Sequence, residues 1–338
     1  MNTKSLFFIE GILKSLVHLL EYNSLVSITK IFDKSLKAPT EHKDKKLLKI
    51  LLQELVQIHK VDSENRKNNI YYVPQTNVKS ILDHFKKLPL VFYDSLEVSK
   101  KRFNNEHQLD LELENVPKYH QRNFHFQSNG YFSKRSALVY DHQVEMLFNG
   151  TAQVMRRLLI SKIKKAKNLN RPIKILEIGG GTGNMIEVFM KSFDVADYVL
   201  LEPSIHYLNQ AKKNNEQFAD KIKYIKTYGE DLSFDDNEFD LVFSIYLFHE
   251  LPQKVRESVI KEMHRVCNKQ GIVAIADSIQ LNDHAEIDVV LKSFAKDYHE
   301  PFYNDYIGWN LATVAKQNQL QLLDVSHQLL TKYWIYQK

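Results

Sequence analysis

The segment Lys174–Gly183, KILEIGGGTG, decides the fold that we expect. Its first residues, Lys174–Ile178, form a short apolar run that predicts a buried β-strand, and Asn184–Phe193, directly after the glycines, has the pattern of a helix. Glycines between a strand and a helix let the backbone turn sharply and approach a ligand closely. Average glycine usage of roughly 7% would give about 24 residues, but the chain has ten, four of which are Gly179, Gly180, Gly181 and Gly183. The sequence therefore concentrates its glycine at one candidate ligand loop.

Strand-like and helix-like segments alternate from residue 172 onward, which indicates βαβ units and a parallel sheet. The further strands that we expect are Tyr198–Leu201, Ile222–Ile225, Phe239–Ile245, Gly271–Ala276, Leu320–Ser326 and Lys332–Tyr336. The further helices are Ile205–Phe218 and Lys254–Val266. The last two strands are separated by a tight turn and should be antiparallel. The fold class is therefore α/β and Rossmann-like, with an antiparallel last strand.

The residues before the sheet are predicted to form two units. Residues 1–105 read as an all-helical N-terminal domain, with two amphipathic helices within residues 5–36, a third over 47–58, a polar linker over 61–69 and a short helix over Val78–Phe85. Residues 106–171 read as an acidic linker, an aromatic lid and one long helix over Val139–Lys167. The sheet domain then spans 172–338, with an insertion over 278–318 that covers the substrate.

Composition excludes several classes of protein. The chain is 43% hydrophobic and 26% charged, so it can bury a core and is neither collagen-like nor disordered. Its one cysteine, Cys267, excludes a disulfide framework. Glu10 and Lys14 interrupt the apolar N-terminus, so no signal peptide or membrane span is expected and we predict a cytoplasmic protein. The net charge of +5 is small and lies mostly within residues 1–120, and it does not by itself argue for nucleic acid, which we expect not to be a partner.

The glycine spacing distinguishes between cofactors. A dinucleotide fingerprint needs a third glycine where Asn184 stands, and here an acidic residue, Glu177, precedes the glycines. This arrangement suits a positively charged ligand that carries an amino acid moiety. Glu202, nineteen residues after Gly183, ends the next strand and can accept hydrogen bonds from ribose hydroxyls. Its structural alternative is to cap the following helix, a role that Ser204 can already fill.

Five segments, taken in order, resemble the motifs of class I S-adenosylmethionine-dependent methyltransferases. They are EIGGGTG (177–183), LLEPS (200–204), TYGEDL (227–232), FDLVFSIYLFHEL (239–251) and EMHRVCNKQGIVAIAD (262–277). The resemblance covers roughly residues 120–338. It implies a seven-stranded sheet with an antiparallel last strand, and S-adenosyl-L-methionine as the cofactor.

The resemblance also assigns cofactor-binding residues. Glu177 and Gly179–Gly183 would line the methionine part, and Glu202 would hold the ribose. The adenine would lie against Ile205 and the Gly229-Glu230-Asp231 loop; the family's acidic adenine-binding residue aligns with either Tyr228 or Asp231, and we prefer Asp231. Ile245 and Tyr246 would face the sulfonium and the methyl group, which also agrees with the binding of ligands at the carboxyl ends of parallel strands.

The acceptor side is less determined by sequence. A general base is needed only for a protonated acceptor, and its candidates are His249, Glu250, Asp277, His299 and Glu300. His249 and Asp277 have structural alternatives, as a histidine at a helix start and as a loop cap. We expect His299 and Tyr303, in the insertion, to touch the substrate, and name His249, His299 and Tyr303 as the catalytic candidates. His299 and Glu300 have no third ligand at helical spacing, so no metal site is predicted.

The function that we predict is methyl transfer from S-adenosylmethionine to oxygen, nitrogen or carbon of a small-molecule acceptor, by in-line displacement. One alternative is an RNA or protein methyltransferase, although Ser244–Leu247 stands where an Asn-Pro-Pro-Tyr-type motif would be. A third possibility is a non-catalytic cofactor-binding subunit. A fourth is a nicotinamide dehydrogenase, and the missing third glycine argues against this last class. The helical N-terminus would serve for homodimerisation or substrate capping, or as a protein-binding module.

Overall fold

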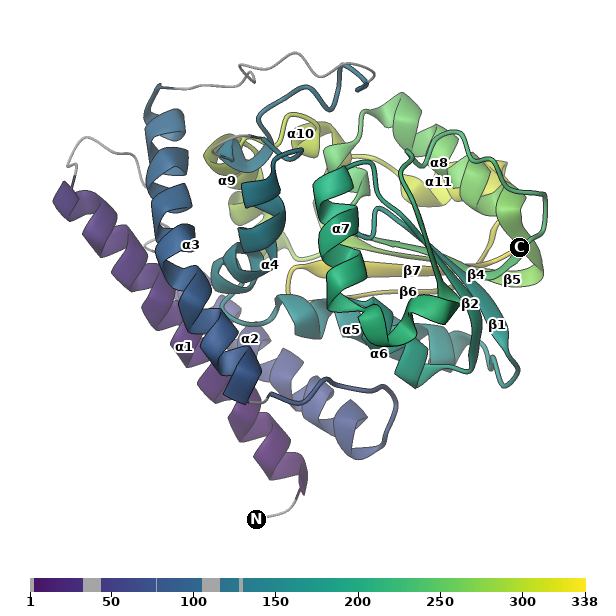
Figure 1. Ribbon diagram of the computed structural model, residues 1–338, viewed down its shortest axis with the longest axis horizontal. Helices are drawn as coiled ribbons and strands as arrows, with labels where there is room; N and C mark the ends of the chain where they lie inside the picture. The colour runs from purple at the N-terminus through teal and green to yellow at the C-terminus, as the bar shows by residue number, and fades with distance from the viewer. Residues whose placement is uncertain (1–2, 33–43, 77, 105–115, 128–129) are drawn as a thin grey trace.

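The computed structural model describes residues 3–32, 44–76, 78–104, 116–127 and 130–338. Three long helices flank an α/β domain (Figure 1): α1 (Thr3–Phe32), α2 (Lys45–Lys67) and α3 (Val78–Asn104). The helices that follow are α4 (Lys134–Leu147), α5 (Ala152–Ala166), α6 (Ile186–Ser192), α7 (Ile205–Asn214), α8 (Gln253–Val266), α9 (Asp288–Tyr298), α10 (Tyr303–Tyr306) and α11 (Leu311–Gln317). The candidate site therefore belongs to a sheet domain that carries a helical N-terminal region.

One seven-stranded sheet has the order β3-β2-β1-β4-β5-β7-β6. The strands are β1 (Ile173–Ile178), β2 (Val195–Leu201), β3 (Ile222–Ile225), β4 (Phe239–Ile245), β5 (Cys267–Ser278), β6 (Gln321–Gln328) and β7 (Thr331–Gln337). The first five run parallel, and β7 pairs antiparallel with both β5 and β6. The predicted α/β class, seven strands and antiparallel last strand are confirmed.

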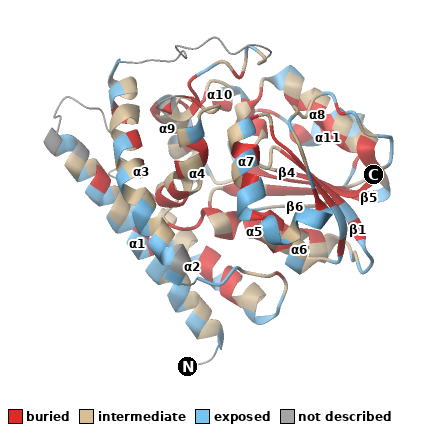
Figure 2. Ribbon diagram, viewed as in Figure 1, coloured by how far each residue is buried: buried red, intermediate tan, exposed pale blue. Residues whose placement is uncertain are grey.

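Apolar side chains of each central strand alternate between two cores, one on each face of the sheet. In β1, Leu176 and Ile178 enter the core covered by α8 and α11, whereas Ile173 and Ile175 enter the core covered by α5, α6 and α7. Figure 2 shows the buried strands between these helices. Because both faces are covered, β1 and β4 are apolar almost throughout, and polar residues gather where the strands end.

The N-terminal helices are longer than predicted. One helix, α1, replaces the two expected within residues 5–36, since neither proline nor glycine interrupts residues 12–32. The polar residues 61–67, expected to be linker, complete α2. Helix α3 continues through Pro89 to Asn104. Most of the acidic linker expected before residue 117 lies outside the described residues.

The prediction of one helix over Val139–Lys167 is wrong, because the chain turns between α4 and α5. Asn149 and Gly150 have φ values of 48° and 73°, the left-handed region that ends helices. A Cβ on Gly150 would lie 2.9 Å from Cδ2 of His18 in α1. The turn therefore packs against the N-terminal helix and sends α5 along the sheet.

A buried ion pair joins α2 to α5. Nε and Nη2 of Arg157 donate to the two oxygens of Asp62 at 2.7 and 2.6 Å, and the Tyr71 hydroxyl donates to Asp62 at 2.7 Å. Burial opposes ionisation of Asp62, but Arg157 and Tyr71 hold its pKa below the ordinary value. The helical region is thus fixed to the sheet domain by a bidentate, charge-assisted contact.

No described helix has the combination of length and hydropathy that crossing a bilayer requires.

Replacing Asp62 by alanine should lower the free energy of unfolding by about 3–5 kcal/mol, because Arg157 then stays buried without its counter-ion. Urea unfolding at pH 7 measures this loss. The folded pKa of Asp62 is depressed, so its contribution is present above the ordinary carboxyl pKa and is lost as the pH falls through the folded value. Asp83→Ala is the matched control, since Asp83 and Lys86 form an exposed pair at 3.8 Å. Equal losses in the two variants would contradict the assignment.

Candidate functional site

The glycine loop lies where β1 and β2 end side by side. The backbone N–H groups of Gly179 and Gly180 both donate to the carbonyl oxygen of Leu201, at 2.9 and 3.0 Å. Gly179 and Gly181 have φ values of 73° and 55°, which favour glycine. A Cβ on Gly180 would lie 2.5 Å from a Leu200 methyl, so the approach to β2 also requires glycine. The loop is therefore fixed against the sheet edge and leaves its outer side to a ligand.

Glu202, at the end of β2, accepts hydrogen bonds from three groups around this loop. One oxygen accepts from Ser204 N at 2.8 Å, and the other accepts from Gly181 N at 3.1 Å and from the Tyr131 hydroxyl at 3.0 Å. Burial raises the pKa of Glu202 to about 7 despite these bonds. A ligand that offers hydroxyl donors can replace Tyr131 on this carboxylate.

Glu177 is a second buried carboxyl group beneath the loop. It accepts a hydrogen bond from the Tyr198 hydroxyl at 2.6 Å. Burial raises its pKa to about 8, because neither this bond nor the charge of Arg156 compensates for the lost hydration. Two adjacent carboxyl groups with raised pKa values favour a ligand that brings positive charge and hydrogen-bond donors.

A cavity of about 70 Å³ opens between these two carboxyl groups and the loop. Its wall includes nine of the predicted cofactor residues: Glu177, Gly179, Gly180, Gly181, Glu202, Gly229, Glu230, Ile245 and Tyr246. It also includes Tyr228, the alternative to Asp231. The structure thus brings most of the predicted set together at one place.

Three residues of the predicted cofactor set do not line this cavity. A Cβ on Gly183 would meet Ala211 and Ile186 at 2.9 Å, so this glycine serves the packing of α6 against α7. Ile205 is 45% exposed at the start of α7, and Asp231 is exposed beyond the loop. Of the two alignments, the structure places Tyr228 rather than Asp231 on the wall. The sequence motif predicted the position of the loop correctly, but it did not predict which side chain of the loop faces the cavity.

A second cavity of about 210 Å³ adjoins the first. Tyr140, Arg156 and Tyr246 line both cavities, so they stand at the junction. Tyr246 has a φ of 57°, which is uncommon for a bulky residue and turns the chain at the end of β4. Nη1 of Arg156 is buried and has no hydrogen-bond partner among the described residues. The junction therefore holds a cationic donor that is ready for an anionic group.

His249 faces the larger cavity, held by Asp277. Its Nδ1 lies 2.6 Å from Oδ1 of Asp277, which also accepts from the N–H of Ser278 at 2.7 Å. Asp277 thus orients the ring of His249 and also accepts a backbone hydrogen bond at the end of β5. The structural alternatives, a histidine at a helix start and an aspartate that caps a loop, do not account for the contact between the two side chains. Burial lowers the pKa of His249, but Asp277 outweighs burial and raises it to about 9. This pair can take up and hold a proton.

The other two catalytic candidates, Tyr303 and His299, differ in whether they line the larger cavity. Tyr303 lines the larger cavity and shares a hydrogen bond of 2.6 Å with the Ser278 hydroxyl. His299 ends α9 with a φ of 52° and is not among the residues that line either cavity. Its neighbour Glu300 instead pairs with His125, which lines the larger cavity. The role predicted for His299 therefore rests on the sequence alone.

Sequence reasoning missed Arg156 and assigned no role to Tyr131 and Tyr140 beyond a lid. Tyr131 and Tyr140 border the smaller cavity, as Tyr119 and His120 do. Two consecutive arginines, Arg156 and Arg157, interrupt the apolar run over 154–160 of α5 and were a usable signal, because buried arginine is rare without a partner. Arg157 pairs with Asp62, whereas Nη1 of Arg156 has no hydrogen-bond partner among the described residues, and this difference depends on tertiary packing.

Comparison with known proteins agrees with this geometry. Residues 175–271 match the family model described as a methyltransferase domain. These residues are similar to a methyltransferase domain, which agrees with the resemblance of the sequence motifs. S-adenosylmethionine, the cofactor that the resemblance implies, has the positive charge and hydroxyl donors that the buried carboxyl groups and the glycine loop fit.

The matches cover part of each relative. A sterol 4-C-methyltransferase of Caenorhabditis elegans is 28% identical over 133 residues, which are 36% of this chain and 36% of that protein. A ubiquinone/menaquinone biosynthesis C-methyltransferase of Idiomarina loihiensis is 24% identical over 179 residues, 51% of this chain and 66% of that protein. The chain thus spans about one to two thirds of these relatives. A solved methyltransferase of Aquifex aeolicus has 16% identity and a TM-score of 0.40, covering 52% of this chain and 88% of its own.

Cofactor binding should release protons near pH 7. With a pKa of about 8, Glu177 is mostly protonated in the free protein, and a nearby ammonium group lowers that pKa. We expect release of close to one proton per S-adenosylmethionine bound, which calorimetry measures as a difference between heats in phosphate and in Tris buffer. Glu177→Gln should remove most of the difference, whereas Glu187→Gln, on the surface pair with Lys191, should keep it. Heats that do not depend on the buffer would contradict the cationic contact.

Proposed function

We propose that this protein transfers the methyl group of S-adenosylmethionine to a small, largely apolar acceptor that carries an ionisable oxygen. The observation that supports this most directly is the junction between the two cavities at Tyr140, Arg156 and Tyr246. A cofactor held by the glycine loop and an acceptor in the larger cavity would meet there. Alignment of the two reactants is the main contribution that an enzyme makes to such a displacement.

The larger cavity supports a small-molecule acceptor. Its wall combines apolar side chains from α1, α3, α4 and α9 with polar ones, which include Lys30, Arg102 and Gln143 as well as those at the junction. Its apolar members include Leu25, Val144, Met146, Leu147, Leu291, Phe294 and Leu330. A cavity whose lining is mostly apolar by area and also carries placed polar groups is typical of small-molecule sites. The relatives named above are methyltransferases named for sterols and for ubiquinone and menaquinone, which agrees with an apolar acceptor.

Residues of this chain account for the proton that the acceptor loses. When bound, S-adenosylmethionine supplies a methyl group on a positively charged sulfur. His249 faces the acceptor cavity, and Asp277 fixes its Nδ1 and stabilises the imidazolium. A base with a pKa of about 9 matches the acidity of a phenolic hydroxyl, whose pKa is about 10. The proton would pass from the acceptor oxygen to His249. The electron pair of that oxygen would form the bond to the methyl carbon while the carbon–sulfur bond breaks and its electron pair stays on sulfur, which leaves S-adenosylhomocysteine.

Arg156 provides the second polar contribution. It is buried at the junction, and its Nη1 has no hydrogen-bond partner within the described residues. An unpaired buried guanidinium is costly, and an oxyanion or carboxylate that accepts from it removes that cost. We assign to Arg156 the binding of the anionic group that reaches the junction, on either the cofactor or the acceptor.

Turnover should depend on His249 more than cofactor binding does. S-adenosylhomocysteine is quantified by mass spectrometry with phenols, isoprenoid-substituted phenols and sterols as acceptors. We expect kcat/KM to rise with pH, to reach half its maximum near pH 9 and to level off above it, since the base must be unprotonated. We expect His249→Gln to lower kcat by about 10²–10⁴-fold. Its affinity for S-adenosylmethionine should stay within about 2-fold.

His264→Gln is the matched control, because His264 lies on α8 and lines neither cavity. Its turnover should equal that of the unchanged protein. Equal turnover in His249→Gln would remove His249 from the mechanism. Transfer to RNA or protein substrates, without transfer to any small molecule, would overturn the acceptor class, and absence of S-adenosylmethionine binding would overturn the proposal as a whole.

We also propose that the protein forms a homodimer through α1. Five exposed or half-exposed residues of this helix, Leu6, Ile9, Leu13, Leu16 and Leu20, recur at alternating spacings of three and four. This is the heptad pattern by which two helices pack along a seam. An apolar stripe of this length on a surface marks an interface, and a second copy of α1 has the complementary pattern.

Leu13→Glu should convert the dimer to a monomer, because it places two like charges in the apolar seam. Sedimentation velocity at micromolar concentration measures the change. Leu322→Glu, at a residue on β6 that is exposed to a similar extent, should leave the mass unchanged. A monomeric unchanged protein, or a dimer that tolerates Leu13→Glu, would contradict pairing through α1.

A further inference from the structure

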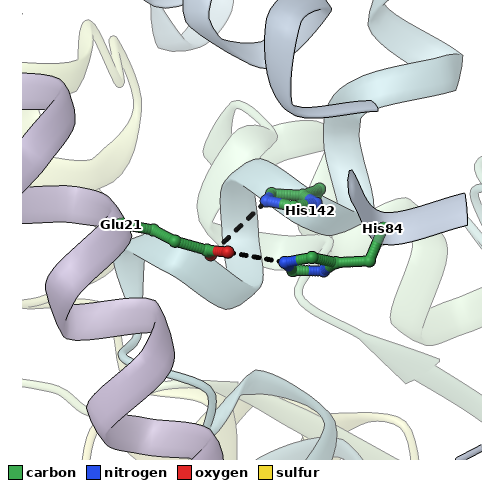
Figure 3. A group of neighbouring side chains, drawn as sticks. All are labelled: Glu21, His84 and His142. Atoms are coloured by element: carbon green, nitrogen blue, oxygen red, sulfur yellow. Dashed lines mark hydrogen bonds and ion pairs between the residues drawn. The ribbon is translucent and has the colours of Figure 1, made fainter. Parts of the chain in front are cut away.

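Side chains from three helices converge at a place outside both cavities. Glu21 of α1, His84 of α3 and His142 of α4 point toward one another (Figure 3), and one ligand atom from each lies within 4.8 Å of the other two. Oε1 of Glu21 is 2.5 Å from Nε2 of His84, and Oε2 is 3.6 Å from Nε2 of His142. Two imidazoles and a carboxylate are a ligand set that proteins use for transition metals.

His142 supplies an independent indication of a ligand. It is only 7% exposed, and its Nε2, which points into the cluster, has no hydrogen-bond partner among the described residues. The 3.6 Å separation from Glu21 is longer than a hydrogen bond. A buried nitrogen left in this state costs about 1–3 kcal/mol, and coordination to a metal would satisfy it.

The cluster is compact and is supported by a fourth side chain. The rings of His84 and His142 are 4.2 Å apart. Nδ1 of His18 lies 3.0 Å from Oε2 of Glu21 and orients the carboxylate. Such outer contacts are typical of metal ligands.

We propose that Glu21, His84 and His142 bind one divalent transition-metal ion of the zinc class. Tetrahedral coordination at about 2.0–2.1 Å separates ligand atoms by about 3.3 Å, so small side-chain rotations convert the observed spacing into a site. Nitrogen donors disfavour Mg²⁺ and Ca²⁺, which take oxygen ligands. His84 is the most exposed of the three and provides the entry path. The sequence predicted no metal site, and this one combines residues 58 to 121 positions apart.

The site would join the three helices where their apolar core is small. Among the described residues, the adjacent cluster of buried apolar side chains comprises Leu25, Val91, Val139 and Met146 from the same three helices, with the partly buried Tyr22, Leu90, Phe92 and Leu138 packed against it. A core of this size contributes little stability, and small units commonly add a metal for that purpose. Because α1 and α4 also line the larger cavity, the metal would hold part of the acceptor-site wall in place.

Zinc affinity of the full chain tests the proposal. After treatment with a chelator, Zn²⁺ is titrated in competition with a chromogenic chelator, and Co²⁺ is added separately to record its visible absorption. We expect one tight equivalent of Zn²⁺, a tetrahedral Co²⁺ spectrum, and a rise in Tm of about 4 °C at a hundredfold excess over Kd. An equal concentration of Mg²⁺ should not displace the Zn²⁺.

Glu21→Gln, His84→Gln and His142→Gln should each weaken the tight equivalent by at least about 100-fold and abolish the Co²⁺ spectrum. Glu21→Gln is nearly isosteric, so it preserves helix packing where a histidine replacement disturbs it; circular dichroism checks each fold. His264→Gln should bind as the unchanged protein does.

Absence of a tight equivalent from the unchanged protein would overturn the site. So would retention of that equivalent in a folded Glu21→Gln variant, or an equal loss in His264→Gln. In each of these cases the cluster is a hydrogen-bonded ion pair without a metal.

Discussion

The two hydrogen bonds from Gly179 and Gly180 to the carbonyl of Leu201 are the constraint on which the site depends. They fix the loop after β1 to the end of β2 and thereby place Glu177 and Glu202 under one cavity. Among the described residues neither carboxyl group has a cation in contact, and burial raises both pKa values into the neutral range. The site is therefore prepared for a ligand that carries the missing charge and donors, at an energetic cost that cofactor binding relieves.

Tyrosines from the segment before β1 complete the same site. Tyr131 donates to Glu202, and Tyr119 donates to Glu230 across the cavity. These hydroxyls satisfy acceptors that the resemblance assigns to cofactor contacts. The aromatic segment thus does more than cover the site, because its hydroxyls bond to the carboxylates to which the resemblance assigns the nucleoside.

The sheet and its loop were predictable because their signals are local. Strand periodicity, the glycine spacing and the acid nineteen residues later are fixed by the backbone, and all lie near the positions expected. Asp231, His299 and the uninterrupted Val139–Lys167 helix depend on how side chains pack between distant segments, and there the predictions diverge from the structure. Arg156 and the Glu21, His84 and His142 cluster are determined by contacts between helices, which no spacing in the sequence encodes.

Helix α4 connects all of these features through three consecutive residues. Tyr140 stands at the junction of the cavities, Asp141 accepts from Thr182 and Asn184 of the glycine loop at 2.6 and 2.9 Å, and His142 enters the cluster with Glu21. Successive side chains on a helix diverge by about 100°, so three consecutive residues of one turn contact three separate parts of the molecule. Fixing any one of these contacts limits the rotation of α4 and hence the positions of the other two. The N-terminal helices are thus connected to the glycine loop through α4, because His142 contacts Glu21 and Asp141 contacts Thr182 and Asn184.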